Sequence, residues 1–176
     1  MTGEFSECPE AEAEAPVGAY ERLVAQLDAG QARYRLIDHA PEGRTELVSA
    51  LRGNELGAAA KCMVVMVKVS KKQVRYVLAV VPGDTRVDFS ALKAHLGGSY
   101  AAMADEDKAE QLAGSIAGTI LPFSHDPRLE LVVDPGLVSV PEIYFNAGRL
   151  DRSVALATED YLSLASPRVV PIATRQ

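Results

Sequence analysis

Two consecutive apolar runs constrain the fold more than any other feature of this sequence. Residues 61–69 (KCMVVMVKV) and 74–81 (VRYVLAVV) are rich in β-branched side chains, and a short polar turn separates them. Runs of this length and composition are typical of β-strands, and near-continuous apolarity is typical of strands that are covered on both faces. We therefore expect a central pair of strands buried inside the protein.

The flanking segments predict short helices mixed with further strands. Helices are expected at 20–29, 45–51, 88–96, 106–112 and from 158 onward, and strands at 32–40, 129–133, 142–146, 153–157 and 169–172. Thr45, Asp88 and Thr158 are the predicted N-cap residues, because their side-chain oxygens can accept from main-chain N–H groups of the first helical turn. Strands and helices that mix without a regular repeat predict an α+β domain with a curved, barrel-like, mixed or antiparallel sheet.

Length and composition are typical of one globular domain. The chain has 176 residues, of which 48% are hydrophobic, and residues 1–16 are acidic, with five glutamates and no lysine or arginine. We expect a flexible tail at 1–16 and a single domain at 17–176. No segment reads as a membrane span or an export signal, and the two cysteines, Cys8 and Cys62, predict no disulfide framework. The expected location is the cytoplasm.

The positive charges are concentrated on the two central strands. The net charge is −6, but most of it belongs to the acidic tail, whereas residues 57–83 contain five cations and no carboxylate. The five cations are Lys61, Lys68, Lys71, Lys72 and Arg75. They could attract the phosphates of an RNA. They could instead protect an exposed hairpin from pairing with other strand edges.

Several common kinds of site are excluded. The sequence has no Walker-type loop and no dinucleotide-binding fingerprint, and Ser115 misses the spacing of a nucleophile elbow by one residue. His39, His95 and His125 stand singly, without the spacing of a zinc site. Cys62 reads as a small buried hydrophobic residue rather than a nucleophile. We expect no metal and no cofactor.

Lys61 is the unusual residue of the first strand. Strand alternation places it on the same face as Met63, Val65 and Val67, where an ammonium group needs a reason to be. At the mouth of a pocket it would offer a positive charge to a carbonyl, a carboxylate or a phosphate. It could instead extend its ammonium group past the strand end into water. The residues themselves leave both readings open.

Five segments in order resemble a known family. They are AAAKCMVVMVKV, YVLAVVPGDTRVD, LGGSYAAMADEDKAEQLAGSIAGTILPF, LELVVDP and EIYFNAGRLDRSVALATEDY. On these segments the chain resembles the YbaK/EbsC family of prolyl-tRNA synthetase associated editing domains, and most of all its stand-alone, YeaK-type members. The resemblance extends from about Tyr20 to Val170.

The resemblance implies a trans-editing hydrolase that cleaves the ester between a wrongly attached amino acid, serine, threonine or alanine, and the 3′ end of a tRNA. It implies that Lys61 is the key polar residue of the pocket and that Gly118 and Pro122 belong to a GxxxP loop that forms the opposite wall. It further implies substrate-binding positions at Thr119, Ile120, Leu121, Phe145, Asn146, Gly148, Asp151 and Ser153. The implied partners are the mischarged tRNA and an aminoacyl-tRNA synthetase, with no membrane and no DNA.

An aminoacyl ester is already activated, so a positioned water or the free ribose hydroxyl could attack it without a protein nucleophile. In this scheme Lys61 neutralises charge on the terminal phosphate or on the ester carbonyl, and Lys68, Lys71, Lys72 and Arg75 contact the acceptor stem. Two alternatives remain open. The same pocket could bind a tRNA end or an amino acid without turnover, or the basic hairpin could dock on a protein partner while the pocket is vestigial.

Overall fold

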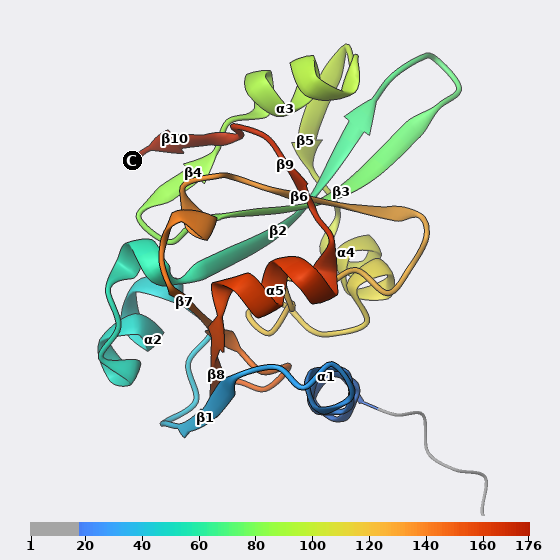
Figure 1. Cartoon of the computed structure of the whole chain (residues 1–176). Coiled ribbons are helices and arrows are strands. Elements are labelled where there is room, and N and C mark those ends of the chain that lie inside the picture. The colour runs from blue at the N-terminus through green and yellow to red at the C-terminus, as the bar shows by residue number, and fades with distance from the viewer. Residues whose placement is uncertain (1–17) are drawn as a thin grey trace, which may run out of the picture.

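The computed structural model describes residues 18–176 (Figure 1), so the predicted tail at 1–16 lies outside the described residues. The helices of this part of the chain are α1 (Ala19–Ala29), α2 (Thr45–Arg52), α3 (Phe89–Leu96), α4 (Glu106–Ala113) and α5 (Thr158–Ala165). The strands are β1 (Tyr34–Asp38), β2 (Ala60–Lys68), β3 (Val74–Pro82), β4 (Thr85–Val87), β5 (Tyr100–Met103), β6 (Leu129–Val133), β7 (Glu142–Asn146), β8 (Arg152–Ala157), β9 (Arg168–Val169) and β10 (Ala173–Arg175). Two short 3-10 turns lie at Leu56–Ala58 and Leu137–Ser139.

A five-stranded mixed sheet in the order β5-β2-β3-β6-β9 forms the centre of the molecule. β2 is antiparallel to β3 and β5, whereas β3, β6 and β9 run parallel. Two smaller antiparallel sheets have the orders β1-β8-β7 and β10-β4. A parallel bridge between Ala59 and Tyr144 links the chain just before β2 to β7, but the described strands do not close into a barrel. The mixed sheet with short helices confirms the predicted α+β class.

The central strands are buried on both faces, as their apolar runs predict. Val64, Leu78 and Val80 face a core cluster that includes residues of α1 and α5, among them Leu23 and Tyr161. The alternate residues of the same strands face a second cluster, which includes residues of α3. Figure 1 shows α3 on one side of this sheet and α1, α4 and α5 on the other. Apolar side chains on both faces are thus removed from water, which is the main stabilising contribution to such a fold.

The helix starts agree with the predictions at one position and differ at two. The Asp88 carboxylate accepts a hydrogen bond from the Ala91 N–H at 3.0 Å, so Asp88 caps α3 as predicted. The predictions for Thr45 and Thr158 are wrong, because each is the first helical residue, and the N-cap positions are those of Arg44 and Ala157. A side chain caps a helix from the residue before the first turn, so these threonines are one position too late.

The predicted closing strand at 169–172 is mostly wrong, because only Val169 of it lies in a strand, β9, and β10 begins after it at Ala173. The cause is the buried carboxylate of Asp134, whose Oδ1 accepts from the main-chain N–H groups of Ile172 and Ala173 at 2.9 and 3.0 Å. These donors are therefore not available to a neighbouring strand. The structure also adds β4 and β5, two short strands that the sequence did not predict. Among residues 18–176, no helix has both the length and the apolarity required to cross a membrane.

Candidate active site

A pocket of about 300 Å³ lies where the start of β2 meets the segment before α2, the 118–120 segment and the end of β7. In Figure 1, α2 and the adjoining ends of β2 and β7 lie at the same end of the molecule. The structure brings together five of the predicted site residues here: Lys61, Gly118, Ile120, Phe145 and Asn146 all line the pocket. They come from three segments that are far apart in the sequence, so only the fold makes them neighbours.

Lys61 is partly buried near the start of β2, and its amine does not extend freely into solvent. The Lys61 Nζ donates a hydrogen bond to the main-chain oxygen of Thr85 at 3.2 Å. No carboxylate of the described residues forms an ion pair with it. The pocket is therefore lined by an ammonium group that keeps donor capacity for a ligand.

The segment from Gly118 to Pro122 forms a bend, and only part of it lines the pocket together with Lys61. Gly118 has a φ of +84°, in the left-handed region that favours glycine. Gly118 and Ile120 line the pocket, whereas Thr119 and Leu121 are buried. Pro122 does not line the pocket, and its carbonyl accepts a hydrogen bond of 2.7 Å from the Tyr161 hydroxyl. The structure thus places Gly118 at the pocket and Pro122 behind it, as an anchor of the bend.

Asn146 connects the two walls next to this bend. Its side-chain nitrogen donates to the main-chain oxygens of Glu42 and Gly118, both at 2.9 Å. Its side-chain oxygen accepts from the hydroxyl of Ser153 at 3.0 Å, and Ser153 is fully buried. Since both oxygens bound by Asn146 accept only, its amide orientation is fixed by the network. Ser153 therefore acts behind the pocket, where it orients Asn146.

The family model described as aminoacyl-tRNA editing domain matches residues 39–164, most of the described chain. The chain belongs to this family. The match covers the whole pocket of the editing domain, from the segment before α2 to the end of β7, and it confirms the resemblance found in the sequence.

Two relatives and two solved structures agree with the assignment. The Multifunctional Ser/Thr-tRNA deacylase ProXp-y of Escherichia coli K12 is 42% identical to this editing domain over 152 residues, which cover 86% of this chain and 90% of the relative. The protein of the same name from Escherichia coli O157:H7 matches equally. The hypothetical protein APE2540 aligns with a TM-score of 0.78 at 21% identity, over 88% of this chain and all of its own. A proposed trans-editing enzyme for prolyl tRNA synthetase aligns with a TM-score of 0.74 at 19% identity, over 91% of this chain and 99% of its own. These two structures show the shared fold.

Two further predicted site residues of the editing domain lie outside the pocket lining. The Asp151 carboxylate forms an ion pair with Arg149 at 2.9 Å. Gly148 has a φ of +75°, and a Cβ at this position would lie 2.9 Å from the main-chain nitrogen of Tyr20. Gly148 therefore allows the β7–β8 turn to pack against the start of α1.

The basic residues of the hairpin lie far from the pocket. Lys68 ends β2, and Lys71 and Lys72 lie in the turn before β3, which projects from the body in Figure 1. Ten residues separate Lys71 from Lys61, about 30 Å of extended strand. Arg75 is already engaged, because its guanidinium pairs with the Glu130 carboxylate and donates to the main-chain oxygen of Leu96 at 3.2 Å. The three lysines form no ion pairs with described residues, so they remain available to a partner.

Arg52 and His39 are among the polar residues near the pocket that were not selected from the sequence; Arg44, Thr45 and Glu46 also line it. Arg52, the last residue of α2, lines the pocket. His39 lies behind it, with Nε2 at 2.6 Å from the Ser153 hydroxyl and Nδ1 at 2.9 Å from the Ala40 carbonyl. A cation in the last turn of a helix reads as an ordinary helix-dipole contact. No spacing in the sequence distinguishes either residue.

Neither a cysteine nucleophile nor a bound metal has support in this geometry. Cys62 lines the pocket and packs against the core, and burial raises the pKa of its thiol well above the usual range. A thiol of this kind stays protonated and is a poor nucleophile. Within residues 18–176, no three histidine, cysteine, aspartate or glutamate side chains lie close enough together to bind a metal ion.

Proposed function

We propose that this chain is a trans-editing deacylase that releases serine or threonine from wrongly charged tRNA by hydrolysing the 3′ ester. The observation that supports it most is that a named Ser/Thr-tRNA deacylase is 42% identical over 86% of the chain, while Lys61 and Gly118 line one small pocket. A volume of about 300 Å³ suits a small amino acid together with part of the terminal ribose.

Lys61 is the proposed electrostatic group. When water or the free ribose hydroxyl attacks the ester carbon, negative charge develops on the carbonyl oxygen, and a nearby ammonium stabilises it. The hydrogen bond to Thr85 holds the amine in place before the substrate arrives. Since the ester is activated, orientation and charge stabilisation suffice without a covalent intermediate.

The bend and Asn146 position the substrate in this proposal. Gly118 and Ile120 form the wall against which the aminoacyl group lies, and Phe145 supplies an apolar surface beside it. Asn146 keeps that wall at a fixed separation from the segment before α2, because it bonds both main chains. Thr119, Leu121, Pro122 and Ser153 support these contacts from behind. Gly148 and Asp151 hold the neighbouring turn.

The proposed partner is the acceptor end of a mischarged tRNA, with a synthetase as a second, transient partner and the cytoplasm as the compartment. Lys68, Lys71 and Lys72 lie about 20–30 Å along the hairpin from Lys61, a separation comparable to the distance from a tRNA 3′ end to its acceptor stem. Arg75 contributes less to tRNA binding, because Glu130 already neutralises it.

The test is a panel of tRNAs mischarged with serine, threonine, alanine and a large amino acid, incubated with the purified protein. We expect fast release of serine and threonine and slow release of the large residue. Binding without release from any of them would support the non-catalytic binding module instead. Loss of a complex on substitution of Lys71 and Lys72, with no release by the wild type, would support a docking subunit.

A further inference from the structure

Arg52 is a charged residue of the pocket that has no counter-ion among residues 18–176. Lys61 and Arg52 are the two lining cations that form no ion pair with a described residue, whereas the third, Arg44, is paired with Glu42 at 2.7 Å. Glu46 is the one carboxylate of the lining, and it is exposed and makes no ion pair with either cation. The pocket therefore carries an excess of positive charge.

The guanidinium of Arg52 is held in place by neutral groups alone. Its Nε donates to the Asn54 side-chain oxygen at 2.8 Å, Nη1 to the Ser153 hydroxyl at 3.2 Å and Nη2 to the Ser49 hydroxyl at 3.3 Å. Ser49 and Ser153 are buried, so they fix the position of the guanidinium. An arginine has five N–H donors, so two of them keep no described partner.

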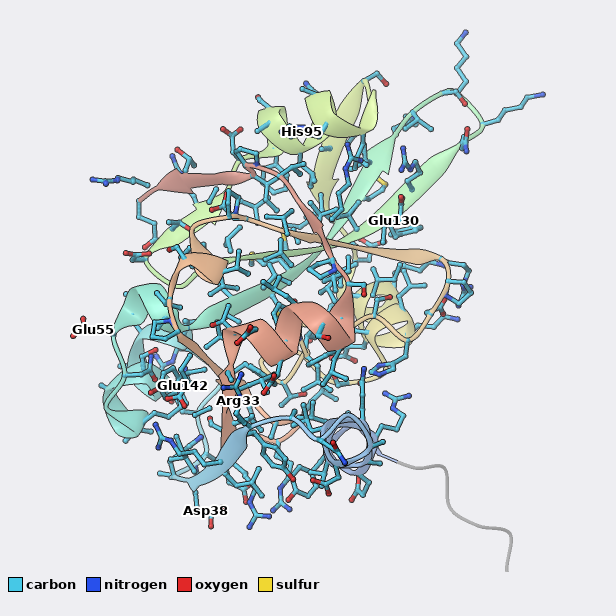
Figure 2. All side chains as sticks on the ribbon, in the orientation of Figure 1. Arg33, Asp38, Glu55, His95, Glu130 and Glu142 are labelled. Atoms are coloured by element: carbon cyan, nitrogen blue, oxygen red, sulfur yellow. The ribbon has the colours of Figure 1, made fainter. Side chains whose placement is uncertain are left out.

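A partly buried guanidinium that is held only by neutral groups is unfavourable for the free protein. Burial lowers the pKa of Arg52 to about 10, because the charge is removed from water and no carboxylate of the described residues pairs with it. The group is still charged at neutral pH. Exposed arginines of this chain, such as Arg33 (labelled in Figure 2) and Arg35, instead pair with carboxylates. An arginine fixed in a pocket with free donors is suited to an oxyanion that a ligand brings.

The chemistry of the substrate limits what this oxyanion can be. In an aminoacyl ester the carboxyl group of the amino acid is consumed by the ester bond, and its amino group is cationic. The terminal ribose and adenine are neutral. The anion nearest to the ester is therefore the phosphodiester that joins the terminal nucleoside to the nucleotide before it.

We infer that Arg52 binds this terminal phosphodiester, which leaves Lys61 to act on the ester carbonyl. The inference rests on the proposed function and divides its two cationic roles between two residues. Arg52 is thus a substrate-binding residue that places the ester beside Lys61. Because Ser153 contacts both Arg52 and Asn146, the phosphate site and the wall of the aminoacyl site share one buried support.

The test compares two substrates that differ in this phosphate. One is a tRNA charged with serine, and the other is 3′-O-seryl-adenosine, which carries the same ester and no phosphate. Arg52→Gln removes the charge but keeps polar contacts, Arg52→Lys keeps the charge, and Lys93→Gln on α3 is the control for loss of an unpaired cation outside the pocket. Thermal unfolding of each variant checks its fold.

We expect Arg52→Gln to lower kcat/KM on the seryl-tRNA by about 10 to 100-fold, the range for a lost charge-assisted hydrogen bond, and to lower seryl-adenosine hydrolysis far less. Arg52→Lys should recover part of the loss. The slope of log KM against log salt should fall by about 0.7 in Arg52→Gln, as for one contact to a single strand. Lys93→Gln should match the wild type on both substrates.

Three results would overturn the inference. An equal loss on both substrates would give Arg52 a structural role or a role at the ester. No loss on either would mean that it binds no anion of the substrate. Weaker inhibition of Arg52→Gln by free serine, with unchanged kcat/KM on the tRNA, would assign it to the carboxylate of the product. If the wild type hydrolyses neither substrate, the proposed function fails. The phosphate site can then be tested separately, by comparing the affinity of the wild type and of Arg52→Gln for an uncharged RNA that ends in CCA.

Discussion

Gly43 and Gly118 lie against each other in the wall of the pocket. A Cβ built on Gly118 would lie 3.1 Å from the Gly43 Cα, and one built on Gly43 would lie 3.2 Å from the Gly118 Cα. Few real Cβ atoms approach other atoms so closely. The segment before α2 can therefore touch the bend only because both positions are glycine, and the Asn146 side chain bonds across the same contact.

Gly118→Ala should damage both stability and the pocket. The left-handed φ of +84° costs a non-glycine residue about 1–2 kcal/mol, and the new methyl group pushes the two segments apart. We expect a lower free energy of unfolding together with slower deacylation. Gly97→Ala is the matched control, because Gly97 has a φ of +66° with no atom within 4 Å of the built Cβ. It should lose stability through the backbone strain alone and keep the wild-type rate. Equal deacylation rates in Gly118→Ala and Gly97→Ala would show that the contact between Gly43 and Gly118 does not shape the pocket.

Substitution of Lys61 should affect the rate far more than the fold. Lys61→Met keeps an apolar stem on the strand and removes the ammonium. If the amine stabilises charge on the carbonyl oxygen, single-turnover deacylation should slow by about 100-fold or more. The melting temperature should change little, because the lost hydrogen bond to Thr85 is a single contact. An unchanged single-turnover rate would remove Lys61 from the mechanism.

Asn146→Asp replaces the two donated hydrogen bonds by repulsion at nearly constant volume. The carboxylate would face the main-chain oxygens of Glu42 and Gly118, which can only accept. Leaving such partners unsatisfied costs about 1–3 kcal/mol, so we expect lower stability in urea and a reduced kcat. Asn54→Asp is a useful comparison, since it would place a carboxylate next to the Nε of Arg52. That variant should fold normally, and a loss of stability equal to that of Asn146→Asp would argue against a special role for Asn146.

Acid stability should depend on Asp126. Hydrogen bonds from the Arg128 side chain, at 2.8 and 3.1 Å, lower the pKa of this carboxylate to about 2. The folded-state pKa is below the unfolded value, so the unfolded state binds the proton first as the pH falls. The stabilisation is thus complete above about pH 4 and is lost as the pH falls towards 2.

Asp126→Asn should therefore flatten the stability profile between about pH 4 and 2, with a small effect near neutral pH because the pair is close to solvent. The measurement is urea unfolding at several pH values. Asp107→Asn, at an exposed carboxylate in the first turn of α4, should keep the wild-type profile. Parallel profiles for the wild type and Asp126→Asn would show that the ion pair does not contribute.

Much of the architecture could be predicted because its signals are local. The apolar runs of β2 and β3 predict strands buried on both faces, and the two core clusters confirm this. Asp88 lies one residue before its helix and caps it as predicted. β5 could not be predicted, because Tyr100–Met103 contains two alanines, which have low strand propensity, and forms a strand only by pairing with the edge of β2.

Of the site residues too, some could be recognised from the local sequence and others could not. Lys61 could be selected from the sequence because an ammonium in an apolar strand conflicts with its surroundings at short range. Arg52 could not, because it looks like an ordinary cation at the end of a helix, and its burial depends on Ser153, which is about a hundred positions away in the chain.

The sequence by itself determined the family, the α+β class and the one lysine that its own strand cannot accommodate, since these depend on residue types within a few positions of each other. The tertiary structure alone decided which residues share the pocket. It placed Arg52 there with no counter-ion from the described part of the chain, and it placed Pro122 behind the wall. The physical reason is that burial and the pairing of charges depend on packing between distant segments, and no local pattern in a sequence records them.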